Sequence, residues 1–363
     1  MTTLRDYSLT GTSTKRAVEI GLATAEWYHT DIPRKEMKAL MKREDGPALR
    51  DMALFYGLML ATAAAAILLW PSWWAAPFLF VYGTLYTSGA DSRWHEAGHG
   101  TAFRTDRYNT VVYQIACFCL LRNPVIWRWS HARHHTDTII VGRDPEIVAM
   151  RPPDIAKVVA LFFGLETLQA VPRVFRLAFS GLTPDEKDFV PEAERPKAIR
   201  VARVWAAILI ATLLAAIAFR TVLPLMLIVG PALWGSWHYV MTGLLQHTGM
   251  ADNVIDHRLN SRTVLMNPVS RFLYWNMNYH VEHHMFPMVP YHRLPELHAA
   301  IGHDLPAPNR SIAEGLREVA TALRRQLADP EYRIEKALPP SARPYRYDLH
   351  AEALGFDTVA AAE

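Results

Sequence analysis

Residues 73–99, WWAAPFLFVYGTLYTSGADSRWHEAGH, join a charge-free apolar run to a pair of histidines, and this combination decides the fold. A charge-free stretch that approaches about 20 residues can cross a membrane as a helix. His95 and His99 are four positions apart, so their imidazoles share one face if the helix continues beyond the apolar run. We therefore expect a membrane helix that carries metal ligands where it leaves the bilayer.

Two more histidine clusters follow the same rule. They are HARHH, with His131, His134 and His135, and HVEHH, with His280, His283 and His284. Each presents two or three imidazoles to a common point at helical spacing. Eight imidazoles are too many for one ion and suit two. Zinc sites close at four ligands and often use cysteine, and copper storage favours sulfur ligands. A nitrogen-only site with open positions for oxygen suits iron, so we expect two Fe ions.

Four apolar segments reach or approach spanning length. They are residues 52–70, 73–94, 203–219 and 222–245. Only Pro-Ser separates the first two and only Arg-Thr the last two, so each pair predicts a tight helical hairpin. The predicted fold is an all-α integral membrane protein with four transmembrane helices in two hairpins. Buried helices of a soluble protein are the weaker alternative, because these segments have almost no polar face.

Basic residues indicate the topology. Lysine and arginine concentrate in residues 91–200 and in both tails, so the positive-inside rule places these parts in the cytoplasm. We expect a cytoplasmic N-terminal segment at 1–50, a membrane domain at 51–305 and a cytoplasmic tail at 306–363. The histidine clusters then lie in a cytoplasmic helical cap that holds a di-iron site. We expect the stretches 111–121 and 158–182 to lie along the membrane surface or within the cap.

Other bulk features exclude some functions. The first ten residues lack the apolar run of a signal peptide, and the apolar spans can serve as insertion signals themselves. A net charge of +3 is too small to favour nucleic acid as a partner. Cys117 and Cys119 lie in an apolar segment and are expected to be small buried residues in a reducing compartment.

The three clusters in order carry a resemblance. HEAGHGTAF (95–103), WRWSHARHH (127–135) and NYHVEHHMFP (278–287) resemble the histidine boxes of the membrane fatty acid desaturase and hydroxylase superfamily, over about residues 50–300. The first box has three residues between its histidines where four often stand. The resemblance implies an O2-dependent di-iron oxidoreductase with one further ligand beyond the eight. His247, at the cytoplasmic end of the fourth span, stands where that ligand is expected.

Other polar groups near the boxes are candidates to orient the imidazoles by accepting their distal N–H. They are Glu96, Asp137, Asp144, Glu282, Asn276, Asn278 and Asp91. Salt bridges between the acidic members and Arg93, Arg128, Arg133 or Arg143 are the alternative. His238 lies deep in the fourth span and is expected to bond within the bundle or to lie near the substrate path. Most histidines outside the boxes (His29, His257, His292, His298, His303 and His350) are expected at the solvated surface.

The resemblance also implies a reaction. Hydrogen is removed from an unactivated carbon, and the carbon radical then gives either an alkene or an alcohol at the same site. A fatty acyl lipid is the expected substrate, and a carotenoid or a small polar metabolite is the alternative. His280 opens the third box where front-end desaturases have glutamine, which argues against that subclass.

Electrons must come from a separate protein, because the chain shows no HPGG-type cytochrome b5 motif and no flavin or nicotinamide fingerprint. We expect a ferredoxin or rubredoxin with its reductase, docked on basic residues around Arg128, Arg133 and Arg143. The rival class is a membrane metal-binding or transport protein without redox chemistry. That class requires ionisable groups along a path through the spans, and only His238 lies deep within an apolar segment.

Overall fold

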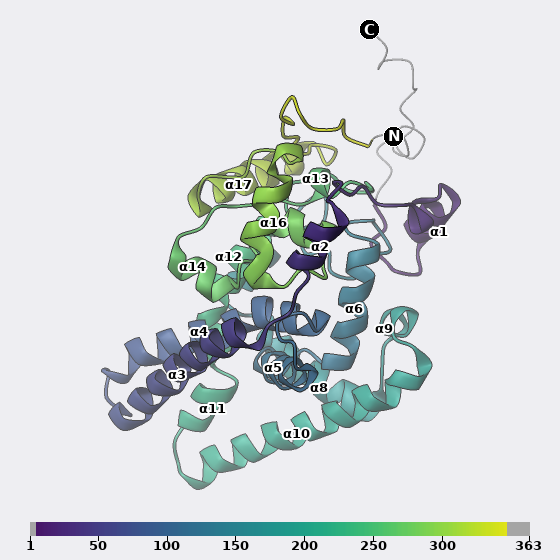
Figure 1. Ribbon diagram of the computed structural model, residues 1–363. Coiled ribbons are helices and arrows are strands. Elements are labelled where there is room, and N and C mark those ends of the chain that lie inside the picture. The colour runs from purple at the N-terminus through teal and green to yellow at the C-terminus, as the bar shows by residue number, and fades with distance from the viewer. Residues whose placement is uncertain (1–4, 347–363) are drawn as a thin grey trace.

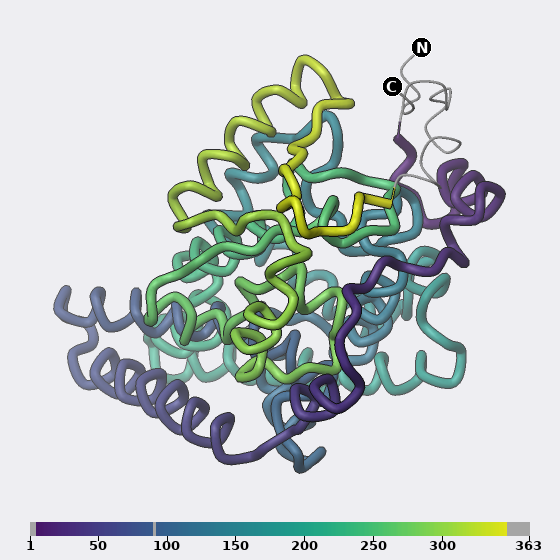
Figure 2. The backbone as a smooth tube through the Cα atoms, turned by 45° about the horizontal axis from the view of Figure 1, so that its top comes forward, coloured from purple at the N-terminus to yellow at the C-terminus, as the bar shows by residue number. Residues whose placement is uncertain are grey.

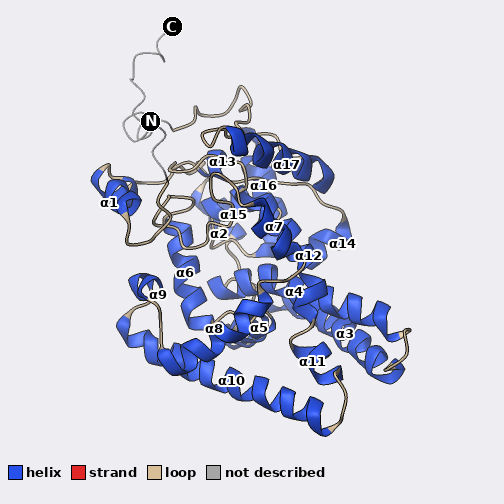
Figure 3. Ribbon diagram, turned by 180° about the vertical axis from the view of Figure 1, so that it is seen from behind, coloured by secondary structure: helices blue, strands red, loops and turns tan. Residues whose placement is uncertain are grey.

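The computed structural model describes residues 5–346, except for the side chains of Ala90 and Asp91. Within these residues the regular elements are helices (Figure 3), apart from isolated β-bridges at Thr263 and Val264. The all-α class expected from the sequence is confirmed.

Long helices occupy one side of the molecule. Helices α3 (Asp45–Leu69) and α4 (Ala75–His99) form an antiparallel hairpin at the left of Figure 1, and α10 (Arg195–Ala218) runs along the bottom. Two helical segments of the described chain, Arg34–Leu69 and Glu192–Ala218, are long and apolar enough to cross a membrane. They contain all but the last residue of each of the predicted spans 52–70 and 203–219.

Two bent helix pairs give two further candidate spans if each pair is counted as a single span. Helices α5 (Asp106–Cys119) and α6 (Pro124–Thr136) meet at 100°, and α7 (Ile155–Phe162) and α8 (Thr167–Ser180) meet at 87°. The second bend divides the predicted helix 158–182. It lies at Gly164, where φ is +62° and an added Cβ would lie 1.8 Å from a backbone oxygen of Ala232. Only glycine fits this turn.

The segment 222–245 is two helices, α11 (Leu223–Ile228) and α12 (Pro231–His247), and the prediction of one continuous helix was wrong. Pro231 has no backbone N–H to donate to the preceding turn, so the helical hydrogen-bond ladder is interrupted there. A new helix therefore starts at Pro231. Helix α4 continues beyond residue 94, where the apolar span ends, and carries His95 and His99 among its last five residues, as expected.

Shorter helices form a cap over one end of α4 and α12 (Figure 1). They are α1 (Thr12–Glu19), α2 (Arg34–Leu40), α9 (Pro184–Phe189), α13 (His257–Asn260), α14 (Pro268–Tyr274), α15 (His280–Met285), α16 (Leu294–Ile301) and α17 (Ile312–Ala328).

Arg258 joins the two ends of the described chain within this cap. Its guanidinium donates to the Asp256 and Asp304 carboxylates and to the backbone oxygens of Arg343 and Pro344, and it lies 3.7 Å from the ring centre of Tyr28. The yellow end of the described chain therefore crosses beside the purple N-terminal segment in Figure 2. Because the side chain of Arg258 is fully buried, these partners replace the water that it loses.

Helices α4 and α12 approach each other closely through glycines. An added Cβ on Gly235 would lie 2.0 Å from the backbone oxygen of Gly83. The Trp234 indole next to it donates to the backbone oxygen of Leu79 at 2.8 Å. Small residues permit such contact between helix backbones in a membrane. Since α4 carries the first histidine cluster and α12 ends at His247, this contact sets the separation between them.

We predict that Gly235→Val forces the two helices apart and destabilises the protein by about 1–3 kcal/mol, as overpacking does. The same change moves His247 away from the first cluster, so bound metal falls together with the thermal midpoint. Gly57→Val is the matched control, because an added Cβ there meets no atom within 4 Å. Thermal unfolding in detergent and metal analysis check both variants. An unaltered midpoint and metal content in Gly235→Val would contradict the prediction.

Candidate metal centre

The structure gathers the nine histidines that the sequence nominated as ligands. They form two groups, and within each group the candidate ligand nitrogens lie within 4.8 Å of one another. The first group contains His95, His99, His131, His135 and His283, and the second contains His134, His247, His280 and His284.

Helical geometry divides the clusters between the groups. On α6, His131 and His135 are one turn apart and face the first group, whereas His134 points to the second. On α15, His280 and His284 face the second group and His283 faces the first. Helices α6 and α15 therefore each contribute to both groups, and α4 and α12 each contribute to one.

The Nε2 atoms converge within each group. In the first, the Nε2 atoms of His95 and His283 are 2.7 Å apart, and those of His131 and His99 are 3.1 Å apart. In the second, His280 lies 3.0 Å from His247 and 3.1 Å from His284, again between Nε2 atoms. Ring nitrogens this close repel each other unless a proton or an ion lies between them.

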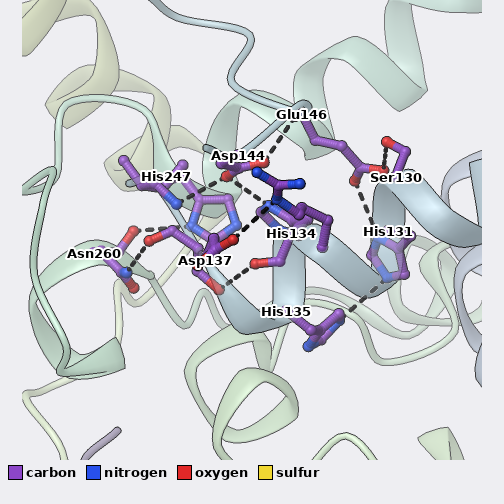
Figure 4. Close-up of polar contacts among 12 residues, drawn as sticks. Ser130, His131, His134, His135, Asp137, Asp144, Glu146, His247 and Asn260 are labelled. Carbon is purple, nitrogen blue, oxygen red and sulfur yellow. Dashed lines mark hydrogen bonds and ion pairs between the residues drawn. The ribbon is translucent and has the colours of Figure 1, made fainter. Parts of the chain in front are cut away.

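The hydrogen-bond partners of the Nδ1 atoms show which nitrogen of each ring carries the proton. The Nδ1 atom of His131 faces a Glu146 carboxylate oxygen at 3.0 Å, and that of His134 faces Asp144 at 2.8 Å (Figure 4). His247 Nδ1 faces the backbone oxygen of Asn260 at 2.9 Å. These oxygens only accept when the carboxylates are ionised, so each Nδ1 carries the proton and donates. In the neutral form of these rings the Nε2 atoms are then unprotonated and present lone pairs.

A set of buried lone pairs aimed at one point is mutually repulsive unless a cation lies between them. Neutral imidazole Nε2 atoms that are oriented by carboxylates or carbonyls are the usual arrangement around a bound metal. The residues present therefore fit two metal ions.

The electrostatics of the site keep most of these rings neutral. Burial, together with neighbouring imidazoles, holds the pKa of His95 and of His283 well below the usual range. Burial acts in the same direction on His134, but the Asp144 carboxylate outweighs it and raises the pKa. Burial alone would raise the pKa of Glu146, yet His131 outweighs burial and lowers that pKa to about 2. Glu146 is therefore an ionised acceptor across the physiological range.

Of the polar residues nominated as orienting groups, Asp144 lies against a box histidine. Asp137 instead pairs with Arg133 at 3.1 Å and with Arg143 at 3.0 Å, which was the alternative considered from the sequence. Glu96 is fully buried and accepts the backbone N–H of Tyr291 at 2.9 Å. Burial raises the pKa of Glu96 to about 7.

The remaining nominated residues bond elsewhere. Glu282 accepts from the Thr263 hydroxyl at 2.6 Å and from His298 Nδ1. Asn276 accepts from Arg271 and donates to the Tyr291 backbone, and Asn278 donates to the backbone oxygen of Val264. None of these partners is a box histidine. The side chain of Asp91 lies outside the described residues.

Sequence reasoning missed Glu146, Asn260 and Thr138, whose hydroxyl lies 3.3 Å from His284 Nδ1. No spacing rule points to them, because Glu146 and Asn260 follow their histidines by 15 and 13 positions and do not share a helix with them. His238 bonds within the bundle to the Ser88 hydroxyl at 3.0 Å, as expected. His257 was expected at the surface, yet only 2% of it is exposed. His350 lies outside the described residues.

We predict that Glu146→Gln weakens metal binding about 10–100-fold, the usual cost of losing an orienting partner. A neutral amide attracts the Nδ1–H less strongly than a carboxylate, so the ring of His131 is held less firmly. Asp137→Asn is the control, because Asp137 also lies beside α6 but pairs with arginines. Competition with a chelator, normalised to folded protein, checks both. Equal losses in the two variants would assign Glu146 to general stability.

Comparisons with known proteins agree with this geometry. The sequence model described as "Fatty acid desaturase" matches residues 70–315, which is more than half of the chain. An omega-3 fatty acid desaturase, chloroplastic, of Glycine max is 28% identical over 275 residues, which cover 68% of this chain and 58% of the relative.

A second relative is a temperature-sensitive sn-2 acyl-lipid omega-3 desaturase (ferredoxin), chloroplastic, of Arabidopsis thaliana. It is 27% identical over 290 residues, which cover 68% of this chain and 60% of the relative. The chain thus matches about three fifths of the length of these curated relatives. The match of the sequence model includes all three histidine boxes and His247. The chain belongs to the fatty acid desaturase family.

Proposed function

We propose that this protein is an O2-dependent di-iron oxidoreductase that desaturates or hydroxylates an unactivated C–H position of a fatty acyl lipid. One observation carries the proposal: two adjoining groups of buried and half-buried histidines aim their Nε2 atoms inward, in a chain of the desaturase family. All nine histidines are proposed as iron ligands.

Two iron ions bound here would supply dioxygen activation and the oxidising power to break a C–H bond. The chain's own residues hold the site ready. Glu146, Asp144 and Asn260 keep the protons on Nδ1 of their histidines and fix the ring planes. The second group has four histidines and the first has five, so the second leaves more room for an oxygen ligand.

A cavity of about 740 Å³ supports a lipid substrate. Its lining includes apolar side chains of α8 and α10, such as Leu177 and Trp205, and it reaches Ser130 and Asp144. Ser130 donates to Glu146 at 2.7 Å, and Asp144 orients His134, so the cavity ends directly outside the histidine groups. An acyl chain needs such an apolar path. Arg122 and Arg173 also line it and suit a polar or anionic head group.

The relatives favour desaturation over hydroxylation, since both are named as desaturases. The name of one relative includes ferredoxin, which supports an iron–sulfur electron donor. Of the basic residues expected to dock it, Arg128 is exposed, whereas Arg133 and Arg143 share the Asp137 carboxylate. That pairing reduces the charge that the latter two offer to an acidic partner. A rubredoxin donor and a carotenoid or small polar substrate remain outcomes of the test.

We infer that the histidine cap faces the cytoplasm, with segments 1–50 and 306–363 on the same side and residues 51–305 forming the membrane domain. The cap lies at one end of the long helices, which supports this arrangement (Figure 1). Protease accessibility of residues 306–346 in right-side-out and inverted vesicles tests it. Cleavage only in right-side-out vesicles would place the cap outside.

The decisive experiment is anaerobic purification followed by metal analysis, together with expression beside a ferredoxin and its reductase. We expect two iron ions per chain and a new acyl product that forms only with O2. His247→Ala should lose iron from the second group and abolish the product. His303→Ala is the matched control, because His303 is exposed and its ring bonds to the backbone oxygen of Ala300 and not to a box histidine. Zinc at full occupancy, with no iron and no O2-dependent product, would overturn the proposal and favour metal binding or transport.

A further inference from the structure

A stack of aromatic rings connects the second histidine group to the protein surface. The ring of His257 lies 5.1 Å from that of His284, centre to centre, at an interplanar angle of 33°. On its other side, His257 stacks on Trp27 at 4.2 Å and 8°. His257 is buried, whereas Trp27 is partly exposed. The three rings therefore form a continuous contact from solvent to a candidate metal ligand.

The position of Trp27 is fixed by its neighbours. Its indole N–H donates to the backbone oxygen of Thr136, at the end of α6, at 3.0 Å. The next residue, Tyr28, donates its backbone N–H to the Ile255 oxygen at 2.9 Å and packs against Arg258. Arg258 adjoins His257 in sequence. The contact between Tyr28 and Arg258 therefore holds the rings of Trp27 and His257 against each other.

A second aromatic contact to the histidines does not lead to the surface in this way. Trp94 lies 4.8 Å from His131 and 3.5 Å from Trp127, centre to centre. Both tryptophans are buried, and Trp127 lines the large cavity proposed for substrate. Among the aromatic side chains in ring contact with the histidine groups, the stack that ends at Trp27 is thus the better placed to meet a protein partner.

We propose that Trp27 and His257 form the route by which electrons from a one-electron iron–sulfur protein reach the metal centre. This inference rests on the proposed di-iron function. Electron tunnelling slows steeply as through-space gaps widen, and stacked rings keep those gaps short. Each transfer oxidises the donor by one electron and reduces one iron(III) to iron(II). Two transfers prepare both ions for dioxygen, and no atom or proton moves along the stack.

The test measures how fast reduced ferredoxin reduces the iron-loaded protein, without substrate or O2, by stopped-flow absorbance. The rate is normalised to bound iron. We expect Trp27→Leu and His257→Leu to slow reduction on the order of tenfold. Trp27→Phe keeps a ring over His257 and should retain most of the rate. Trp73→Leu, at an exposed tryptophan in the turn between α3 and α4, is the matched control and should reduce as fast as the unaltered protein.

Two further measurements separate the possible outcomes. Ferredoxin affinity by calorimetry and peroxide-supported turnover should be unaltered in Trp27→Leu, because the variant slows only electron delivery. A wild-type reduction rate per bound iron in Trp27→Leu would overturn the route. Loss of iron with an unaltered rate per remaining iron would make Trp27 a residue that only positions the site, and would also overturn it. If the unaltered protein binds no iron, the proposed function fails first.

Discussion

Nine imidazoles brought together away from water impose the main constraint on this structure. Each ring loses hydration, and the lone pairs of neighbouring Nε2 atoms repel one another unless cations lie between them. Backbone contacts and acceptors elsewhere hold the rings in place. The close approach of α4 and α12 at Gly83 and Gly235 separates two of the ligand-bearing helices by a fixed distance. Glu146 and Asp144 fix the tautomers.

The helical periodicity of the boxes is local information, and for this reason the sequence could predict which histidines assemble. Closeness in sequence, by contrast, did not identify the groups that bond to these histidines. Glu96 and Glu282 are next to box histidines in sequence, but consecutive residues on a helix point about 100° apart, so these carboxylates face other groups. Asn260 is the last residue of the short helix α13 and Glu146 lies in irregular chain, and the positions of both depend on packing that no spacing rule describes. Pro231 marked the break in the fourth apolar segment, and helix continuity was expected despite it.

The histidine groups and the large cavity both lie at the boundary between the apolar helices and the cap. The cavity is lined in part by α8 and α10 and ends at residues that orient the histidines, so the proposed substrate site would adjoin the proposed metal ligands. The stack through His257 begins at Trp27, which does not line this cavity. The proposed electron route and the proposed substrate path would thus be separate. A donor protein docked at Trp27 would then leave the cavity open.

Both histidine groups draw a ligand from α15, since His283 belongs to the first and His280 and His284 to the second. A nascent chain that has already placed α3, α4 and α10 therefore possesses no complete pocket for either ion until residue 284 emerges from the ribosome. Arg258 is satisfied later still, when the Arg343 and Pro344 carbonyls arrive. If the two groups bind metal as proposed, both sites are completed late in synthesis, and a chain truncated before α15 lacks ligands of both groups.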